Sequence, residues 1–281
     1  MKKFKLDRPK EECGVFGISN HEDASALVAL GLHALQHRGQ EGCGISSFDG
    51  KTFHLEKRQG LVGDHFTDST TIKKLPGETA IGHNRYSTTG EVSLRNVQPF
   101  FADLYSSGVS LAHNGNLTNA IELRNNLVKD GAIFRTTSDT ETIVQLIAKS
   151  NRNKMTDKII DALFQIQGGY ALIMMTNKKL IGIRDPFGIR PLVIGKLKNS
   201  FIFASETCAL DIVGAKFIRE VENGEIVVIE NGELNSLKPF PAKKARPDAF
   251  EYIYFARPDS MLDKKCAYEY RKKNGRRACK R

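Results

Sequence analysis

Apolar and polar residues alternate along several parts of the chain with the period of a β-strand. An apolar stretch with regularly spaced glycines begins at Cys13, and residues 44–58 and 79–87 alternate with Gly and Asp turns between them. Shorter apolar strands are predicted at residues 171–175, 180–183, 192–194 and 201–204. The strand signals therefore lie at both ends of the chain and leave its middle to other structure.

Four segments have the 3–4 spacing of apolar residues that is typical of helices. They cover residues 23–37, residues 117–130, a helix that begins at Ser138, and residues 157–167. Ser138 and Glu141 have the spacing of a capping box at the start of the third helix. The faces expected to be buried are Leu27, Leu30, Ala34 and Leu35 in the first helix and Ile143, Leu146 and Ile147 in the third.

The order of these elements predicts an α+β fold. Residues 225–230 and 233–237 flank Asn231-Gly232, which is the sequence of a type I′ hairpin turn. Strands joined in hairpins and interrupted by a group of helices favour antiparallel sheets with helices packed against them. The regular βαβ alternation of a doubly wound fold is absent from the sequence, as are a Walker loop and a GxGxxG motif.

A change of composition near residue 240 suggests a domain boundary. Prolines interleaved with Lys and Arg mark a linker after the last hairpin, at Pro239, Pro241 and Pro247. Residues 250–281 are too few to form a domain, so another domain is expected to begin here. We predict a pro-segment at residues 1–12, a catalytic domain at 13–240, and a linker with the truncated start of a second domain at 241–281.

The net charge of +10 is confined to the two ends of the chain. Residues 13–263 hold 28 Lys or Arg and 28 Asp or Glu, while residues 264–281 hold nine basic residues and one acidic residue. A neutral body gives no support to a nucleic-acid-binding face. The basic C-terminal run is typical of a solvated helix.

The cysteines and the apolar runs indicate a reducing, cytoplasmic location. The five cysteines are odd in number and widely scattered, and none forms a CxxC pair, which argues against a disulfide framework and a zinc ribbon. No apolar run approaches the roughly 18 residues that span a bilayer. The basic N-terminus lacks the apolar core of a secretory signal.

Cys13 is the first candidate for chemistry. Removal of residues 1–12 would make it the N-terminus, so that one residue carries both a thiol and a free α-amine. An α-amine has an unperturbed pKa of about 7.7–8.0 and can accept a proton near neutral pH, which makes such a residue a self-contained nucleophile and base. A small buried hydrophobic residue is the competing interpretation of a cysteine at the start of a strand.

Hydrolysis of a side-chain amide also needs an oxyanion hole and charges that hold an amino acid. Asn114 and Gly115 could donate two hydrogen bonds to a developing oxyanion, although Asn-Gly is also a common turn. Arg85 could grip a carboxylate with help from the Thr88 hydroxyl, or form a structural salt bridge. Asp139, at the start of a helix, could hold an ammonium group, although acidic residues are favoured there in any case.

Two further features are given structural interpretations. His33 and His37 have the i, i+4 spacing of metal ligands, but the sequence HALQH lacks the glutamate of HExxH and no third ligand is evident. Cys43 is a second thiol that could lie near the site, but a residue inside the chain has no free amine. We predict that Cys43 is a packing residue and that the chain holds no metal.

Nine motifs in order resemble the glutamine phosphoribosylpyrophosphate amidotransferase (amidophosphoribosyltransferase) family from about residue 11 to about residue 275. They are ECGVFGI, LQHRGQEG, GHNRYSTTG, NVQPF, AHNGNL, TSDTE, RDPFGIRPL, SETCALDIVGA and EYIYFARPDS. The first few are shared with other N-terminal-nucleophile (class II) glutamine amidotransferases, whereas RDPFGIRPL and EYIYFARPDS point to the purine enzyme. The resemblance implies a four-layer αββα sandwich with two antiparallel sheets between helix layers.

The resemblance also implies roles for individual residues. Cys13 would be the nucleophile after removal of the pro-segment, and Asn114 with Gly115 would form the oxyanion hole. The remaining roles are substrate binding, with the glutamine carboxylate on Arg85 and Thr88, its ammonium on Asp139, and the pocket lined by Arg38 and Gly39. The implied activity is glutamine hydrolysis, with ammonia passed to a phosphoribosyltransferase half that makes 5-phosphoribosylamine in the first step of purine synthesis.

This chain departs from the family in two respects. It lacks the phosphoribosyl-pyrophosphate-binding half and the magnesium expected there, so alone it is expected to hydrolyse glutamine only. Asp248 stands where some members have the first cysteine ligand of an iron–sulfur cluster, so no cluster is predicted. A homo-oligomer without nucleic-acid or membrane partners is expected. The alternatives are another class II glutamine amidotransferase or a non-catalytic truncated remnant.

Overall fold

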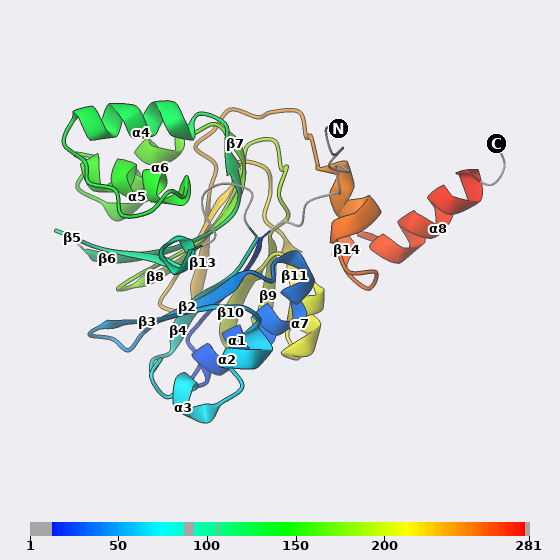
Figure 1. Ribbon diagram of the computed structural model, residues 1–281. Coiled ribbons are helices and arrows are strands. Elements are labelled where there is room, and N and C mark those ends of the chain that lie inside the picture. Colours follow the sequence, from blue (N-terminus) through cyan, green and yellow to red (C-terminus); the bar gives the residue numbers. More distant parts are fainter. Residues whose placement is uncertain (1–12, 87–92, 106, 279–281) are drawn as a thin grey trace, which may run out of the picture.

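The computed structural model describes residues 13–86, 93–105 and 107–278. Two antiparallel sheets lie face to face, and helices cover the outer face of each (Figure 1). Three groups of buried side chains fill the spaces between these layers, one between the sheets and one under each helix layer. The α+β class predicted from the sequence pattern and the αββα order implied by the resemblance are confirmed.

The first sheet has seven strands in the order β11-β9-β10-β1-β4-β2-β3. Its strands are β1 (Gly14–Ser19), β2 (Gly42–Phe48), β3 (Phe53–Gln59), β4 (Thr79–Arg85), β9 (Val193–Leu197), β10 (Ser200–Ala204) and β11 (Lys216–Glu220). Strand β1, although first in the chain, lies in the middle of the sheet between β10 and β4. The β4 pairing extends to Gly14, so the residue before β1 lies beside the end of β4.

The second sheet has six strands in the order β13-β12-β8-β7-β6-β5. Its strands are β5 (Phe100–Leu104), β6 (Ser107–Leu117), β7 (Gly168–Thr176), β8 (Lys179–Arg184), β12 (Ile226–Glu230) and β13 (Glu233–Leu237). Asn231 and Gly232 join β12 to β13 with φ values of 54° and 76°. Both central residues have positive φ, so the type I′ turn predicted from the sequence is confirmed.

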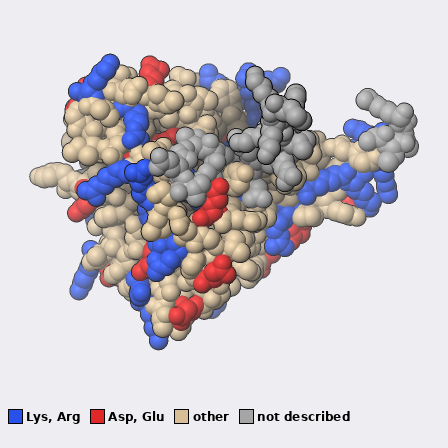
Figure 2. All heavy atoms as spheres, in the orientation of Figure 1, with Lys and Arg blue, Asp and Glu red and all other residues tan. Residues whose placement is uncertain are grey.

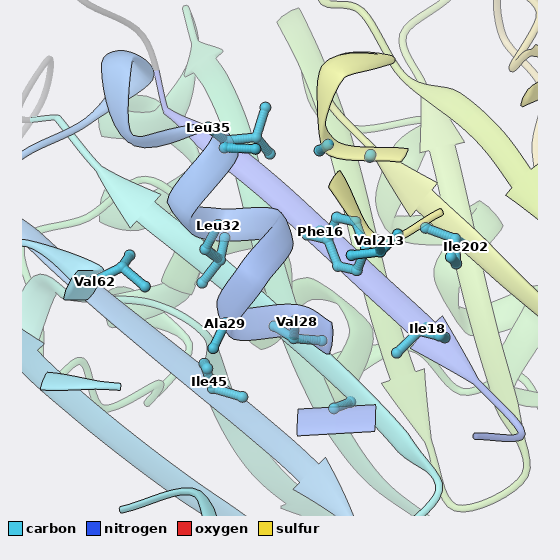
Figure 3. Close-up of a cluster of buried hydrophobic side chains, with 14 of the residues drawn as sticks. Phe16, Ile18, Val28, Ala29, Leu32, Leu35, Ile45, Val62, Ile202 and Val213 are labelled. Carbon is cyan, nitrogen blue, oxygen red and sulfur yellow. The ribbon is translucent and has the colours of Figure 1, made fainter. Parts of the chain in front are cut away.

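Helices form the two outer layers. Against the first sheet lie α1 (Ala24–Ala34), α2 (Val62–His65), α3 (Ser69–Ile72) and α7 (Cys208–Ile212), and against the second lie α4 (Ala120–Lys129), α5 (Thr140–Lys149) and α6 (Met155–Leu163). Short 3-10 turns are η1 (Gln36–Arg38) and η2 (Leu94–Asn96). Figure 3 shows the first of these cores, with Val28, Leu32 and Leu35 lying against Phe16 and Ile18 of β1.

Two local predictions were wrong. Leu30 was expected to be buried, but it is 46% exposed, because α1 is apolar nearly all round and its buried stripe runs through Val28 and Leu32 instead. The capping box at Ser138 does not form as expected. The Glu141 carboxylate instead accepts hydrogen bonds from the backbone of Arg135 and Thr136, both at 2.8 Å, and so holds the loop that leads into α5.

The C-terminal segment packs beside the sandwich and then leaves it. It contains a π-helical turn η3 (Glu251–Phe255), the short hairpin β14 (Met261–Leu262) and β15 (Lys265–Cys266), and α8 (Ala267–Ala278). Helix α8 projects from the body (Figure 1), and its basic side chains are visible as blue atoms along the arm in Figure 2. Among the described residues, no helix has the length and apolar character needed to cross a membrane.

Candidate active site

Cys13 and Arg85 lie level with each other between the two sheets. Gly14 of β1 is opposite Asn84 of β4, so the antiparallel register sets Cys13 beside Arg85. Val15 belongs to the core between the sheets, and Cys13, two residues earlier, has the same facing. Cys13 is 7% exposed, and its thiol donates to the carbonyl of Tyr86 at 3.6 Å.

The electrostatic surroundings of Arg85 favour the charged form of its guanidinium. Burial lowers the pKa of its guanidinium, and the charges of Cys13, Glu41 and Asp139 oppose that shift. Groups from three separate parts of the chain therefore lie close enough to stabilise this one cation. Thr88, the predicted partner of Arg85, lies outside the described residues.

Asn114 and Gly115 lie on β6, in the facing sheet. Asn114 has the same facing as Ala112, which belongs to the core between the sheets. Its side chain is fully buried, and neither amide atom has a hydrogen-bond partner among the residues that the structure describes. A buried amide without a partner costs about 1–3 kcal/mol, so its retention points to a ligand that completes it.

The backbone at Gly115 admits only glycine. Its φ is +140°, and a Cβ placed there would lie 2.1 Å from the carbonyl oxygen of Gly169 on β7. Only glycine fits at position 115 because β6 and β7 approach closely there. The backbone N–H of Gly115 belongs to the residue directly after Asn114, whose side-chain amide is unpaired among the described residues. This arrangement differs from the Asn-Gly turn considered in the sequence, because β6 continues through both residues.

Asp139 immediately precedes α5 and is 8% exposed. Its Oδ2 accepts a hydrogen bond from the backbone N–H of Leu117 at 2.9 Å, which ties the carboxylate to the end of β6. Its Oδ1 lies 3.9 Å from Nδ1 of His113 and 3.5 Å from the hydroxyl of Thr140. The carboxylate is thus fixed close to the strand that carries Asn114.

Gly39 and Arg38 reach the site in different ways. A Cβ on Gly39 would lie 2.6 Å from the backbone carbon of Arg85, so the chain there passes directly against the β4 end. The side chain of Arg38 is fully buried, and its Nε donates to the carbonyl of Cys13 at 3.0 Å. Arg38 therefore contacts the backbone of the candidate nucleophile.

Buried histidines and a glutamine support the strand that carries Asn114, and the sequence analysis did not single them out. Nε2 of His83 lies 3.1 Å from the carbonyl oxygen of His113, which joins the two sheets one residue from Asn114. Gln98 accepts a hydrogen bond from the backbone N–H of His113 at 2.8 Å. Burial lowers the pKa of both histidines, that of His83 to about 3, so both are neutral near pH 7.

The structure also places the residues that were given structural interpretations. Cys43 lies in the core beneath the helices, and burial raises the pKa of its thiol to about 12. His33 is exposed at the surface of α1, while Nε2 of His37 lies 2.8 Å from the carboxylate of Glu206. Within the described residues, no cluster of three or more His, Cys, Asp or Glu side chains could hold a metal ion.

The chain is similar in sequence to known glutamine amidotransferases and amidophosphoribosyltransferases. Residues 83–211 match the glutamine amidotransferase domain family. The chain is 55% identical over 274 residues to the amidophosphoribosyltransferase of Rhizobium etli, covering 96% of this chain and 55% of that protein. It is 44% identical over 276 residues to the amidophosphoribosyltransferase of Staphylococcus aureus, covering 98% and 56%. The chain thus spans about half the length of these curated relatives.

Solved structures give the same result. The glutamine phosphoribosylpyrophosphate amidotransferase from B. subtilis, complexed with ADP and GMP, matches with a TM-score of 0.87 and 42% identity, covering 91% of this chain and 55% of that one. A glutamine aminotransferase class-II domain protein from Silicibacter pomeroyi matches with a TM-score of 0.55 and 12% identity, covering 82% of this chain and 100% of that one. The second match shows a shared fold only.

Proposed function

Because this chain is a homologue of the amidophosphoribosyltransferases and corresponds to their N-terminal glutamine amidotransferase part, we propose that it hydrolyses glutamine at Cys13. The observation that carries the proposal is the register that sets Cys13 level with Arg85 on the face between the sheets. A thiol beside a buried cation, opposite an unpaired amide, suits an amino acid whose side chain ends in a carbonyl.

The reaction follows from the groups present. After removal of residues 1–12, the α-amine of Cys13 takes the thiol proton, and the sulfur attacks the side-chain carbonyl of glutamine. Asn114 and the N–H of Gly115 donate to the developing oxyanion. The C–N bond then breaks, ammonia leaves with the transferred proton, and water hydrolyses the thioester to glutamate.

The remaining site residues hold the substrate. Arg85 binds the α-carboxylate through its planar guanidinium, with Thr88 as a further donor, and Asp139 binds the α-ammonium. Gly39 leaves room beside Arg85, where any side chain would collide with the backbone. Substrate binding therefore depends on charges fixed by β4 and by the start of α5.

We propose that the ammonia serves a phosphoribosyltransferase half, which converts phosphoribosyl pyrophosphate to 5-phosphoribosylamine in the first step of purine synthesis. Magnesium belongs to that half. A homo-oligomer and a cytoplasmic location complete the proposal. An iron–sulfur cluster is not part of it, because Asp248 stands at the expected ligand position and pairs with Arg190 at 3.0 Å.

Ammonia release and intact mass test the glutaminase together. Protein whose mass shows Cys13 at the N-terminus should release ammonia from glutamine, and Cys13→Ala should lose at least about a thousandfold in kcat. Cys43→Ala is the control, since its thiol lies under the helices. Ammonia release that survives Cys13→Ala would contradict the proposal, as would inactivity of the matured protein.

A further inference from the structure

Arg38 joins the candidate nucleophile to two carboxylates that lie far away in the sequence. Its Nε donates to the Cys13 carbonyl at 3.0 Å. Its Nη1 donates to Glu206 at 2.6 Å, and Nη1 and Nη2 both donate to Glu251 at 2.8 and 2.5 Å. The pair with Glu251 is bidentate, the arrangement in which an Arg–carboxylate contact is most directional. We call these four residues the Arg38 clamp.

The clamp is buried and charged. The side chains of Arg38 and Glu206 are 0% exposed and that of Glu251 is 3% exposed. Burial works against the charged form of Arg38, but the two glutamates raise its pKa above the usual value. Burial would likewise raise the pKa of Glu206, but His37 and Arg38 hold it well below its usual range.

Such a cluster is poorly explained by stability alone. Removing charges from water costs several kcal/mol per ion by general experience, and apolar side chains of similar volume often stabilise a core equally well. What the ion pairs do fix is geometry. With its carbonyl held by Arg38, Cys13 has restricted rotation about its Cα–C bond, so the directions of the α-amine and of Cβ, which carries the thiol, are constrained.

Both carboxylates belong to, or contact, the C-terminal segment. Glu251 lies in η3, and Oε2 of Glu206 accepts hydrogen bonds from the backbone N–H of Arg257 at 2.9 Å and the Ser260 hydroxyl at 2.7 Å. The residue after Glu206 continues the contact, because the Thr207 hydroxyl accepts from the N–H of Met261 at 2.9 Å. Residues 251–261 are therefore attached to the body at the clamp.

The outer face of the same segment is open. Ile253 and Tyr254 of η3 are 55% and 51% exposed, while Glu251 and Phe255 face inward. In Figure 1 this turn lies between the sandwich and the projecting α8. A displacement of η3 would therefore pull Glu251 away from Arg38.

We propose that Glu251 is a positioning residue for Cys13, acting through Arg38, so that glutaminase turnover requires residues 251–261 to stay seated on the body. The inference rests on the proposed function and adds a dependence on the C-terminal segment. Misplacing a catalytic group by about 1 Å can cost about a hundredfold in rate, so small movements of Arg38 are sufficient. Substrate binding at Arg85 and Asp139 is not part of the clamp.

The test is Glu251→Gln, which keeps the side-chain volume and removes the charge and one acceptor. Activity is expressed per mole of protein with Cys13 at the N-terminus, determined by intact mass. We expect kcat for ammonia release to fall about 10- to 100-fold while KM for glutamine stays within about twofold. Ser260→Ala, which removes one hydrogen bond to Glu206, should lower kcat about two- to fivefold in the same manner.

The matched control is Glu225→Gln. Glu225 also forms a bidentate pair with an arginine, at 2.7 Å to both Nη atoms of Arg219, but it does not contact the clamp. The kcat of Glu225→Gln should stay within about twofold of the parent value, even if the melting temperature of this variant falls as much as that of Glu251→Gln. Equal losses of kcat in the two variants would mean that Glu251 acts through stability alone and would overturn the inference.

A second readout is independent of turnover. The rate at which iodoacetamide alkylates Cys13, followed by peptide mass mapping, should fall at least about threefold in Glu251→Gln because the amine and thiol are no longer held in place. Unchanged kcat and alkylation in Glu251→Gln, together with an inactive Cys13→Ala, would overturn this inference and leave the glutaminase proposal standing. Full activity of Cys13→Ala would instead remove the glutaminase proposal itself.

Discussion

The two faces of the seven-stranded sheet differ around β4, although the same residue types occur on both. Toward the helices lie Cys43 and Asn84, and the Asn84 amide donates to the carbonyl of Leu32 in α1 at 2.7 Å. Toward the second sheet lies Cys13, and the facing strand presents Asn114, whose amide has no partner among the described residues. The amide nitrogen of Asn84 thus has a partner in α1, whereas neither amide atom of Asn114 has one among the described residues.

The difference shows that side-chain parity decides which residues can act. Cys43 and Gly14 are both opposite Asn84, in β2 and β1, so Cys43 shares the helix side with Asn84. Cys13 is one residue removed from that register and therefore faces the other way. Successive side chains of a strand point to opposite faces of the sheet. The thiol of Cys43 therefore packs under the helices, whereas the thiol of Cys13, offset by one residue, faces the second sheet.

Replacing Asn114 and Asn84 should show the largest difference between the two faces of the sheet. Asn114→Ala should lower kcat for glutamine hydrolysis about 100- to 1,000-fold, because one oxyanion donor is lost. Asn84→Ala should instead lower the free energy of unfolding by about 1–3 kcal/mol and leave kcat within about threefold, because it removes a structural hydrogen bond. Steady-state kinetics and urea unfolding of both variants check this. A larger kcat loss in Asn84→Ala would break the contrast.

A smaller effect is expected at the substrate carboxylate. Arg85→Lys keeps the charge but loses the planar fork, so KM for glutamine should rise about 10- to 100-fold with a lesser change in kcat. Arg58→Lys is the control. Arg58 lies on β3 at the edge of the same sheet and pairs with Glu56, so its replacement should leave KM unchanged. An unchanged KM in Arg85→Lys would remove the assigned role.

The smallest effect concerns pH and stability. His83 and His113 have lowered pKa values in the folded protein, so below about pH 6.5 the unfolded chain binds more protons than the folded one. Their contribution is complete above about pH 6.5 and is lost as the pH falls, for His83 by about 1.4 kcal/mol per pH unit. For His83 this continues to about pH 3.

Urea unfolding at pH 7, 6 and 5 measures this slope. His83→Gln should reduce the slope by about one proton, whereas His21→Gln at the surface should leave it unchanged. A slope that His83→Gln does not alter would mean that the histidine pair is not the buried neutral group between the sheets that the structure describes.

The sequence was sufficient for the fold class and for most elements with strong periodicity. The β12–β13 hairpin and its turn could be predicted, because Asn-Gly between two alternating strands has few other interpretations. The buried face of α1 could not, because a helix that is apolar nearly all round does not show which side meets the sheet. The role of Glu141 could not be predicted either, because its hydrogen-bond partners at Arg135 and Thr136 depend on the path of a loop.

The site was only partly accessible from the sequence. Cys13, Asn114, Arg85 and Asp139 attracted attention because each is a residue type that amide hydrolysis needs. Glu251 is separated from Arg38 by 213 positions, and neither residue type alone signals a buried ion pair. The motif EYIYFARPDS marked the family but did not indicate that its first residue pairs with Arg38, which contacts the Cys13 carbonyl.

The claim that Cys13, and not Cys43, lies on the reactive face of the sheet is tested most directly by covalent labelling. The reagent is a glutamine analogue that carries a diazoketone in place of the side-chain amide. After incubation, digestion and peptide mass mapping identify which cysteine carries the adduct. The account predicts modification of Cys13, protected by excess glutamine, and an unmodified Cys43 in the same sample. An adduct on Cys43, or labelling of Cys13 that glutamine does not prevent, would contradict it.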